Sequence, residues 1–206
     1  MRCDFGGELA RQSAKLLARR SVIIFYVHQW GITMSLDSPS PRPVAIDRAS
    51  STAMVSRTSW GEESHIRVGP EASGGQLTIL DYRAPAGFGP PRHLHQQEDE
   101  VIELVEGQVV VWTPERSFVL APGDLVLLPK HVPHTWRAYG AEPIRFTVTF
   151  TPSGFERFFP DIERLGLVIT DVLELTSVAS DAGMEILGPP LSDEEVRRII
   201  AEAGAS

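Results

Sequence analysis

Cysteine is nearly missing from this sequence of 206 residues, because Cys3 is its single thiol. No intrachain disulfide can form, and a thiolate cage is excluded, so a metal site would have to use nitrogen and oxygen ligands. A secreted fold that depends on disulfides gets no support, and we expect a cytoplasmic location. The chain also lacks an uninterrupted apolar run of about 20 residues, which a membrane-spanning helix needs. We therefore expect no membrane partner.

Positive charge is in the minority. Lys and Arg total 19 against 27 Asp and Glu, which gives a net charge of −8. An acidic surface repels phosphate backbones, and the sequence has no helix-turn-helix pattern, so we expect no nucleic acid partner. Apolar residues make up 42% and charged residues 22%, as is typical of a globular protein with a sizeable core. The length allows one domain with extensions, or two small domains.

Residues 1–55 differ from the rest in composition. Arg19 and Arg20 precede an apolar run that is too short and too soon interrupted for a twin-arginine export signal, and Met34 or Met54 could be the natural start. Ser, Pro, Asp and Arg then dominate, with little apolar periodicity. We expect a poorly structured, irregular N-terminal extension or linker.

Short apolar runs separated by Gly and Pro fill residues 56–152. The expected strands are His65–Val68, Gln76–Tyr82, Glu100–Val105, Gln108–Trp112, Ser117–Leu120, Asp124–Leu128, His134–Ala138 and Ile144–Phe150. Strands at this close spacing, with turn residues between them, predict a β-sandwich or a β-barrel. In the second run we expect Leu77, Ile79 and Tyr82 to lie broadly on one side.

Residues 153–206 change to a helical pattern. Ser153 with Glu156 predicts a capping box at the start of a helix, which Pro160 should kink or break. A second helix, Ser192–Ala203, begins with another capping box. Its packing face consists of Val196, Ile199 and Ile200. We expect both helices to pack on the barrel and assign chemistry to neither.

Histidine and carboxylate residues in two stretches carry the candidate chemistry. His93 and His95 are two residues apart, so in an extended strand both imidazoles point to the same face, about 7 Å apart along the strand. Glu100 follows a polar bend and can add a carboxylate oxygen, and His134 begins a later strand. Nitrogen and oxygen ligands of this kind suit Fe, Mn, Ni, Cu or Zn, and the residues alone do not choose among these metals.

Three neighbouring residues could compete for the same roles. Glu98 and Asp99 adjoin the carboxylate of the cluster, and we interpret both as part of a solvated charged face. His131 is interpreted as a surface residue at a turn.

The spacing of these residues resembles the two motifs of the cupin superfamily. The first motif, Gly-x5-His-x-His-x4-Glu-x6-Gly, is matched at Gly87, His93, His95, Glu100 and Gly107. The second, Gly-x5-Pro-x-Gly-x2-His-x3-Asn, is matched at Gly123, Pro129 and His134. His131 replaces its inner glycine and Ala138 its asparagine. The inner glycine position calls for a positive φ, which His adopts more often than most residues.

Within that superfamily the chain looks most like the single-domain group named after quercetin dioxygenase. The segments that carry this likeness are Pro90-Pro91-Arg92-His93, Asp99-Glu100, Pro129 to His134, Thr151 to Glu156 and Gly188-Pro189-Pro190-Leu191. The resemblance implies a jelly-roll barrel of six to eight strands, with a metal held inside by His93, His95, Glu100 and His134. It also implies a homodimer.

The expected ligand set leaves one or two coordination positions open, as in a catalytic metal site. The preferred hypothesis is therefore a metal-dependent dioxygenase acting on a small oxygenated substrate, aromatic or diketone-like, with iron preferred among the possible metals. Glu100 would be both ligand and catalytic base. Ile102, Leu104 and Trp136 share strand phases with the ligands and are the expected pocket walls. A non-oxidative isomerase or lyase, and a small-molecule binding barrel without turnover, stay open as alternatives.

Overall fold

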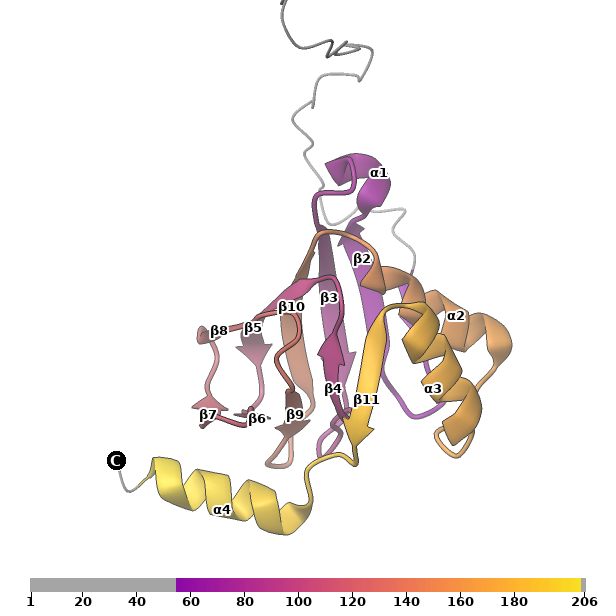
Figure 1. Ribbon diagram of the computed structural model, residues 1–206. Coiled ribbons are helices and arrows are strands. Elements are labelled where there is room, and N and C mark those ends of the chain that lie inside the picture. The colour runs from indigo at the N-terminus through magenta and orange to yellow at the C-terminus, as the bar shows by residue number, and fades with distance from the viewer. Residues whose placement is uncertain (1–54, 205–206) are drawn as a thin grey trace, which may run out of the picture. The chain divides into compact units, whose positions relative to one another are not determined.

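The computed structural model describes residues 55–204, and two antiparallel β-layers make up its centre (Figure 1). The larger layer has six strands in the order β1 (Val55–Arg57), β2 (Glu63–Val68), β3 (Thr78–Ala84), β10 (Ile144–Thr151), β5 (Asp99–Glu106) and β8 (Leu125–Leu128). The extension predicted for residues 1–55 lies outside the described residues except for Val55.

The second layer consists of two smaller sheets. One has the order β7 (Ser117–Leu120), β6 (Val109–Trp112) and β9 (Thr135–Ala138), and the other pairs β11 (Met184–Gly188) with β4 (Arg92–His95). An isolated antiparallel bridge between His93 and His134 connects these sheets. The two layers close over one apolar core, as the predicted all-β barrel requires.

Alternation of buried and exposed residues along the strands builds that core. In β5, Ile102 and Leu104 are fully buried, and β10 places Phe146 and Phe150 beside them. The side predicted for β3 is wrong. Thr78, Leu80, Tyr82 and Ala84 point inward, and Ile79 is only partly buried. Thr78 takes an inward position because its hydroxyl donates to buried Glu156 at 2.9 Å.

Helices cover one side and one end of the barrel. α1 (Pro70–Ser73) joins β2 to β3. After β10 come a short 3₁₀ turn (Phe155–Arg157), α2 (Phe158–Leu165) and α3 (Val172–Asp181), which lie together on one side in Figure 1. The last helix, α4 (Asp193–Ala203), lies against β6 and β7.

The C-terminal segment differs from its prediction in three ways. No capping box forms between Ser153 and Glu156, because the Glu156 carboxylate instead accepts hydrogen bonds from Thr78 Oγ1 and from the Gly154 N–H. Pro160 does not break α2. It occupies the first turn, where its missing N–H would have no partner in the helix. α3 and β11 were not predicted.

The prediction for α4 is confirmed. Ser192 and Glu195 form the capping box, and Val196 and Ile199 are buried with Ile200 packed beside them. Among the described residues, none of the helices combines the length and the apolar character needed to cross a membrane.

Candidate metal centre

The backbone pairs two histidines, His93 on β4 and His134 immediately before β9. His93 N donates to His134 O at 2.9 Å, and His134 N donates to His93 O at 2.8 Å. A third contact, from His131 N to His95 O at 2.9 Å, fixes the loop between β8 and β9 against β4. His131 has a φ of 64°, which confirms the positive φ expected at this position, and its side chain is exposed as predicted.

The same two histidines have their ring orientation set by backbone carbonyls. The Nδ1 atom of His93 lies 2.7 Å from Pro91 O, and that of His134 lies 2.9 Å from Val132 O. A carbonyl oxygen only accepts hydrogen bonds, so each Nδ1 carries a proton, and when either ring is neutral its free lone pair is on Nε2. Both rings are therefore prepared to bind a metal through Nε2.

Glu100 completes the cluster from β5. Its Oε2 atom lies 3.1 Å from His134 Nε2 and 3.5 Å from His95 Nε2. One potential ligand atom from each of the four predicted residues, His93, His95, Glu100 and His134, lies within 4.8 Å of the others, and all four residues are buried. The structure therefore brings together every ligand that the sequence predicted.

Packing holds the inner histidine in place. The ring of His95 lies with its centroid 4.4 Å from that of Phe155 and 5.4 Å from that of Phe150. Its Nδ1 atom is buried without a hydrogen-bond partner among the described residues. Aromatic packing therefore sets the ring orientation of His95, as backbone carbonyls set those of His93 and His134.

Charges within the cluster shift the ionisation of its members. Burial, and then the charges of His134 and His95, lower the pKa of His93 to about 3. Burial works against a charge on His134, but the hydrogen bond and the charge of Glu100 outweigh it and raise its pKa. Burial likewise opposes the charge on Glu100, yet its hydrogen bonds to His134 and His95 lower its pKa. Without a cation, these shifts favour a buried ion pair between charged Glu100 and protonated His134.

The donor set fits a divalent transition metal. Three imidazole nitrogens and one carboxylate oxygen match the ligand preferences of Fe, Mn, Ni, Cu and Zn, and four protein ligands leave positions open on a five- or six-coordinate ion. A bound cation would replace the proton of His134 and satisfy the charge of Glu100.

Metal binding should accordingly depend on pH. A metal cation binds only the neutral form of His134, and the pKa of His134 is raised. The affinity for metal should therefore fall about tenfold for each pH unit below that pKa and become constant above it. Calorimetric titration of metal-free protein with Zn²⁺, in buffers of different ionisation enthalpy, counts the protons released. The exposed-histidine variant His131→Asn should release the same number as the parent protein. An affinity that does not vary with pH across the range from about 5.5 to 8 would contradict the ion pair.

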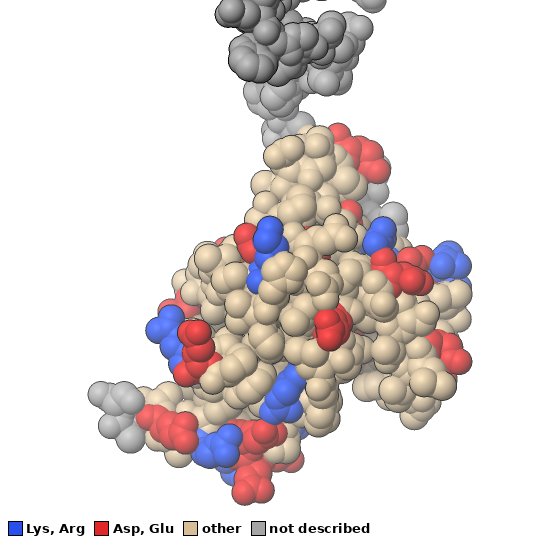
Figure 2. Space-filling view, in the orientation of Figure 1, with Lys and Arg blue, Asp and Glu red and all other residues tan. Residues whose placement is uncertain are grey.

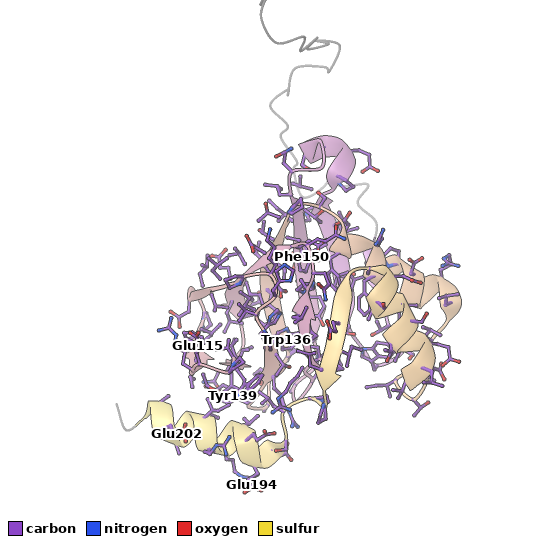
Figure 3. The ribbon with its side chains drawn as sticks, viewed as in Figure 1. Glu115, Trp136, Tyr139, Phe150, Glu194 and Glu202 are labelled. Carbon is purple, nitrogen blue, oxygen red and sulfur yellow. The ribbon has the colours of Figure 1, made fainter. Side chains whose placement is uncertain are left out.

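A cavity of about 460 Å³ opens onto the cluster. Three of the predicted ligands, His93, His95 and Glu100, line it. Most of the remaining wall is aromatic and aliphatic, from both β-layers and from α2 and α3. Figure 3 shows Trp136 and Phe150, two of these residues, inside the barrel.

Of the three residues predicted as pocket walls, one lines this cavity and two do not. Trp136 lines the cavity. Ile102 and Leu104 face inward as their strand phase predicted, but they are fully buried in the core and do not line it. The inner end of the barrel is filled by side chains, so sharing a face with Glu100 does not place a residue at the cavity.

Glu98 was also predicted incorrectly. Its side chain is buried, not part of a solvated face, and burial raises its pKa. Gly154 packs so closely that an added Cβ would lie 2.6 Å from Glu98 Oε1. The neighbouring Asp99 does accept a backbone hydrogen bond, from Lys130 N at 2.9 Å.

Trp60 and Glu62 are among the cavity residues that the reasoning from sequence missed. Both belong to the turn between β1 and β2. A Trp-Gly-Glu-Glu segment at a turn is typical of an exposed loop, and no spacing relates it to the histidines.

Comparison with known proteins agrees with this geometry. The cupin domain family matches residues 82–150, which include all four candidate ligands. Quercetin 2,3-dioxygenase of Bacillus subtilis (strain 168) is 27% identical over 100 residues, a match that covers 48% of this chain and 29% of that protein. The chain thus corresponds to less than a third of this relative.

Solved structures show partial similarity to this chain. The protein TT1209 from Thermus thermophilus is 30% identical, over 38% of this chain and 75% of that one, with a TM-score of 0.36. A sugar phosphate isomerase from a cupin superfamily, SPO2919 from Silicibacter pomeroyi, is 22% identical over 54% of this chain and 77% of that one, with a TM-score of 0.45. The family match identifies residues 82–150 as a cupin domain, and the antiparallel double layer and the complete ligand set agree with that match.

Proposed function

We propose that this protein is a metal-dependent dioxygenase acting on a small oxygenated substrate, aromatic or diketone-like, with iron as its metal. The observation that carries the proposal is a three-histidine, one-carboxylate cluster that opens into a largely apolar cavity. The likeness to quercetin 2,3-dioxygenase, over 100 residues, supports the reaction type.

The cavity suits a substrate of this class. Its volume of about 460 Å³ lies within the range of roughly 300–1,000 Å³ typical of small-molecule sites. Aromatic side chains such as Phe88, Trp136 and Phe159 offer flat apolar surface to a ring. On the face shown in Figure 2, Lys and Arg are interspersed with Asp and Glu, so recognition by one sign of surface charge has no support there.

In this proposal the protein orients the reactants and excludes water. A bound divalent metal supplies Lewis acidity and, if it is redox-active, electron transfer with dioxygen. His93, His95 and His134 hold it through fixed ring orientations, and the apolar walls keep bulk water away. We keep Glu100 as a ligand only, because its Oε2 lies between His95 and His134 and its pKa is lowered.

Oxygen uptake by fully metallated protein tests the proposal. Iron-loaded protein should consume oxygen with at least one member of a panel of flavonols, diketones and catechols, and the variant His134→Ala should not. No uptake with any member would contradict the dioxygenase. Turnover with Zn²⁺ or Mn²⁺ in the absence of oxygen would point instead to an isomerase or lyase. A ligand carried through purification and unchanged on incubation would point to a binding protein.

A further inference from the structure

The cavity contains a second polar group besides the candidate ligands. Glu62 ends the turn between β1 and β2, and Tyr82 lies on β3 at the position paired with Ser64. The Tyr82 hydroxyl donates a hydrogen bond to Glu62 Oε1, and the Trp60 indole N–H donates one to Glu62 Oε2. All three side chains line the cavity that His93, His95 and Glu100 also line.

The two donors define the charge state of this group. An indole N–H can only donate, and with the Tyr82 hydroxyl donating as well, both carboxylate oxygens act as acceptors, as in an ionised carboxylate. Each donor is neutral, so this carboxylate is held among apolar walls by hydrogen bonds from uncharged partners. Burial raises the pKa of Glu62, and burial with the neighbouring Glu62 charge raises that of Tyr82.

Other hydrogen bonds also close this turn, in addition to the contacts of the Glu62 carboxylate with Trp60 and Thr58. Thr58 N donates to Glu62 O at 3.0 Å, Gly61 N donates to Thr58 O at 3.2 Å, and Glu62 N donates to Thr58 Oγ1 at 3.0 Å. These bonds do not involve the carboxylate. A partly buried carboxylate carries a desolvation cost, so its position on a cavity wall calls for a functional explanation.

Tyr82 is held rigidly where it lines the cavity. Its ring lies 5.8 Å from Trp136, 6.1 Å from Phe146 and 5.9 Å from Phe159, measured between ring centroids. The hydroxyl proton points to Glu62, which leaves the lone pairs of the Tyr82 oxygen to accept a hydrogen bond from a bound molecule. A substrate hydroxyl in this cavity can therefore donate to Tyr82.

We propose that Tyr82 and Glu62 together accept the hydroxyl proton of an enol or phenol substrate. The substrate O–H bond breaks as its proton passes to the Tyr82 oxygen, while the Tyr82 O–H bond breaks and its proton passes to the Glu62 carboxylate. The substrate becomes an oxyanion, Tyr82 remains a phenol and Glu62 becomes a neutral acid. No oxidant takes part in this step. The inference rests on the proposed function for the kind of substrate, and it makes Tyr82 a catalytic residue and Glu62 its proton acceptor.

Binding of 4-nitrocatechol under argon tests this pair without any need for turnover. The visible spectrum of this catechol distinguishes its monoanion from its dianion. Zn²⁺-loaded wild-type protein should bind it as the dianion at neutral pH. Tyr82→Phe and Glu62→Gln should hold the same amount of Zn²⁺ yet bind 4-nitrocatechol as its monoanion. In both variants the bound probe should lose its second proton at a pH at least about one unit higher, which is a tenfold change in its acidity.

Two matched controls remove the same groups elsewhere. Tyr139→Phe removes the hydroxyl of a tyrosine that packs beside α4, and Figure 3 shows Tyr139 away from Phe150. Glu63→Gln neutralises the carboxylate next in sequence to Glu62, which pairs with Arg57. Both should behave as wild type. If Glu62→Gln fails to hold metal, Tyr82→Phe decides, because it retains the ring.

Two outcomes would overturn the proposal. One is that the wild-type protein either does not bind 4-nitrocatechol or binds it as the monoanion. The other is an identical bound spectrum in wild type and Tyr82→Phe. Failure of the proposed dioxygenase would show separately, as absent oxygen uptake in a protein that still ionises the probe.

Discussion

Replacing His93 or His134 with alanine should remove the metal from the purified protein. Each side chain supplies one of four buried ligand atoms that lie within 4.8 Å of one another. A four-ligand site binds Zn²⁺ with about 10–16 kcal/mol, so one ligand contributes roughly 3 kcal/mol, or about 100-fold in affinity. Elemental analysis should find about one equivalent of metal in the wild-type protein and only a trace in either variant after dialysis against a weak chelator.

The control for this experiment is His131→Asn. His131 is exposed, lies three residues before His134 and has the positive φ that Asn tolerates. It should keep the full metal content. Stoichiometric metal in both alanine variants would contradict the ligand assignment, and loss of metal from His131→Asn would show that the loop, not the ligand, is decisive.

The ligands could be predicted because strand geometry and motif spacing both act locally. Two residues apart on one strand, His93 and His95 must share a face, and the structure buries both. Glu100 and His134 could be predicted from motif spacing within a known family. The positive φ of His131 could be predicted because this histidine replaces a glycine of the motif. All of these depend on a few neighbouring residues.

The cavity wall could not be predicted because it depends on contacts between distant segments. Ser59 Oγ donates to Leu167 O at 3.3 Å, which joins the β1–β2 turn to the segment after α2. β11 returns from residue 184 to pair with β4 in the register Ile186 to His93. Neither contact leaves a periodic pattern in the sequence. The sequence around Trp60 and Glu62 therefore indicated only an exposed turn, not a cavity wall.

The wrong side assigned to β3 has a similar cause. Leu77 and Ile79 have the stronger apolar character, yet Thr78 is the fully buried residue. Its hydroxyl meets Glu156, 78 positions later, and this hydrogen bond offsets the burial of both polar groups. Burial of Glu98 likewise depends on the close approach of Gly154. In each case a buried carboxylate and a distant glycine or hydroxyl decide an orientation that hydrophobicity alone assigns incorrectly.

Substituting Phe150 with alanine should cause the largest loss of stability while also weakening the metal site. Phe150 is 2% exposed, pairs in register with Glu100 and lies 4.9 Å from Phe155, centroid to centroid. Removing a buried phenyl ring leaves a cavity and should lower the free energy of unfolding by about 3–5 kcal/mol. Urea denaturation followed by tryptophan fluorescence, with EDTA present, measures this loss without a contribution from metal.

Two further variants separate packing from chemistry at this position. Phe150→Leu keeps much of the volume and should lose less stability than Phe150→Ala, whereas Leu127→Ala, at a side chain 57% exposed on β8, should change stability by less than about 0.5 kcal/mol. Because His95 has no hydrogen-bond partner for Nδ1 among the described residues, its ring orientation depends on Phe150 and Phe155. Phe150→Ala should therefore also weaken Zn²⁺ binding under native conditions, and Phe150→Leu less so. A stability loss below about 1 kcal/mol would contradict the packing, and unchanged Zn²⁺ affinity in a destabilised protein would show that His95 is oriented by the metal itself.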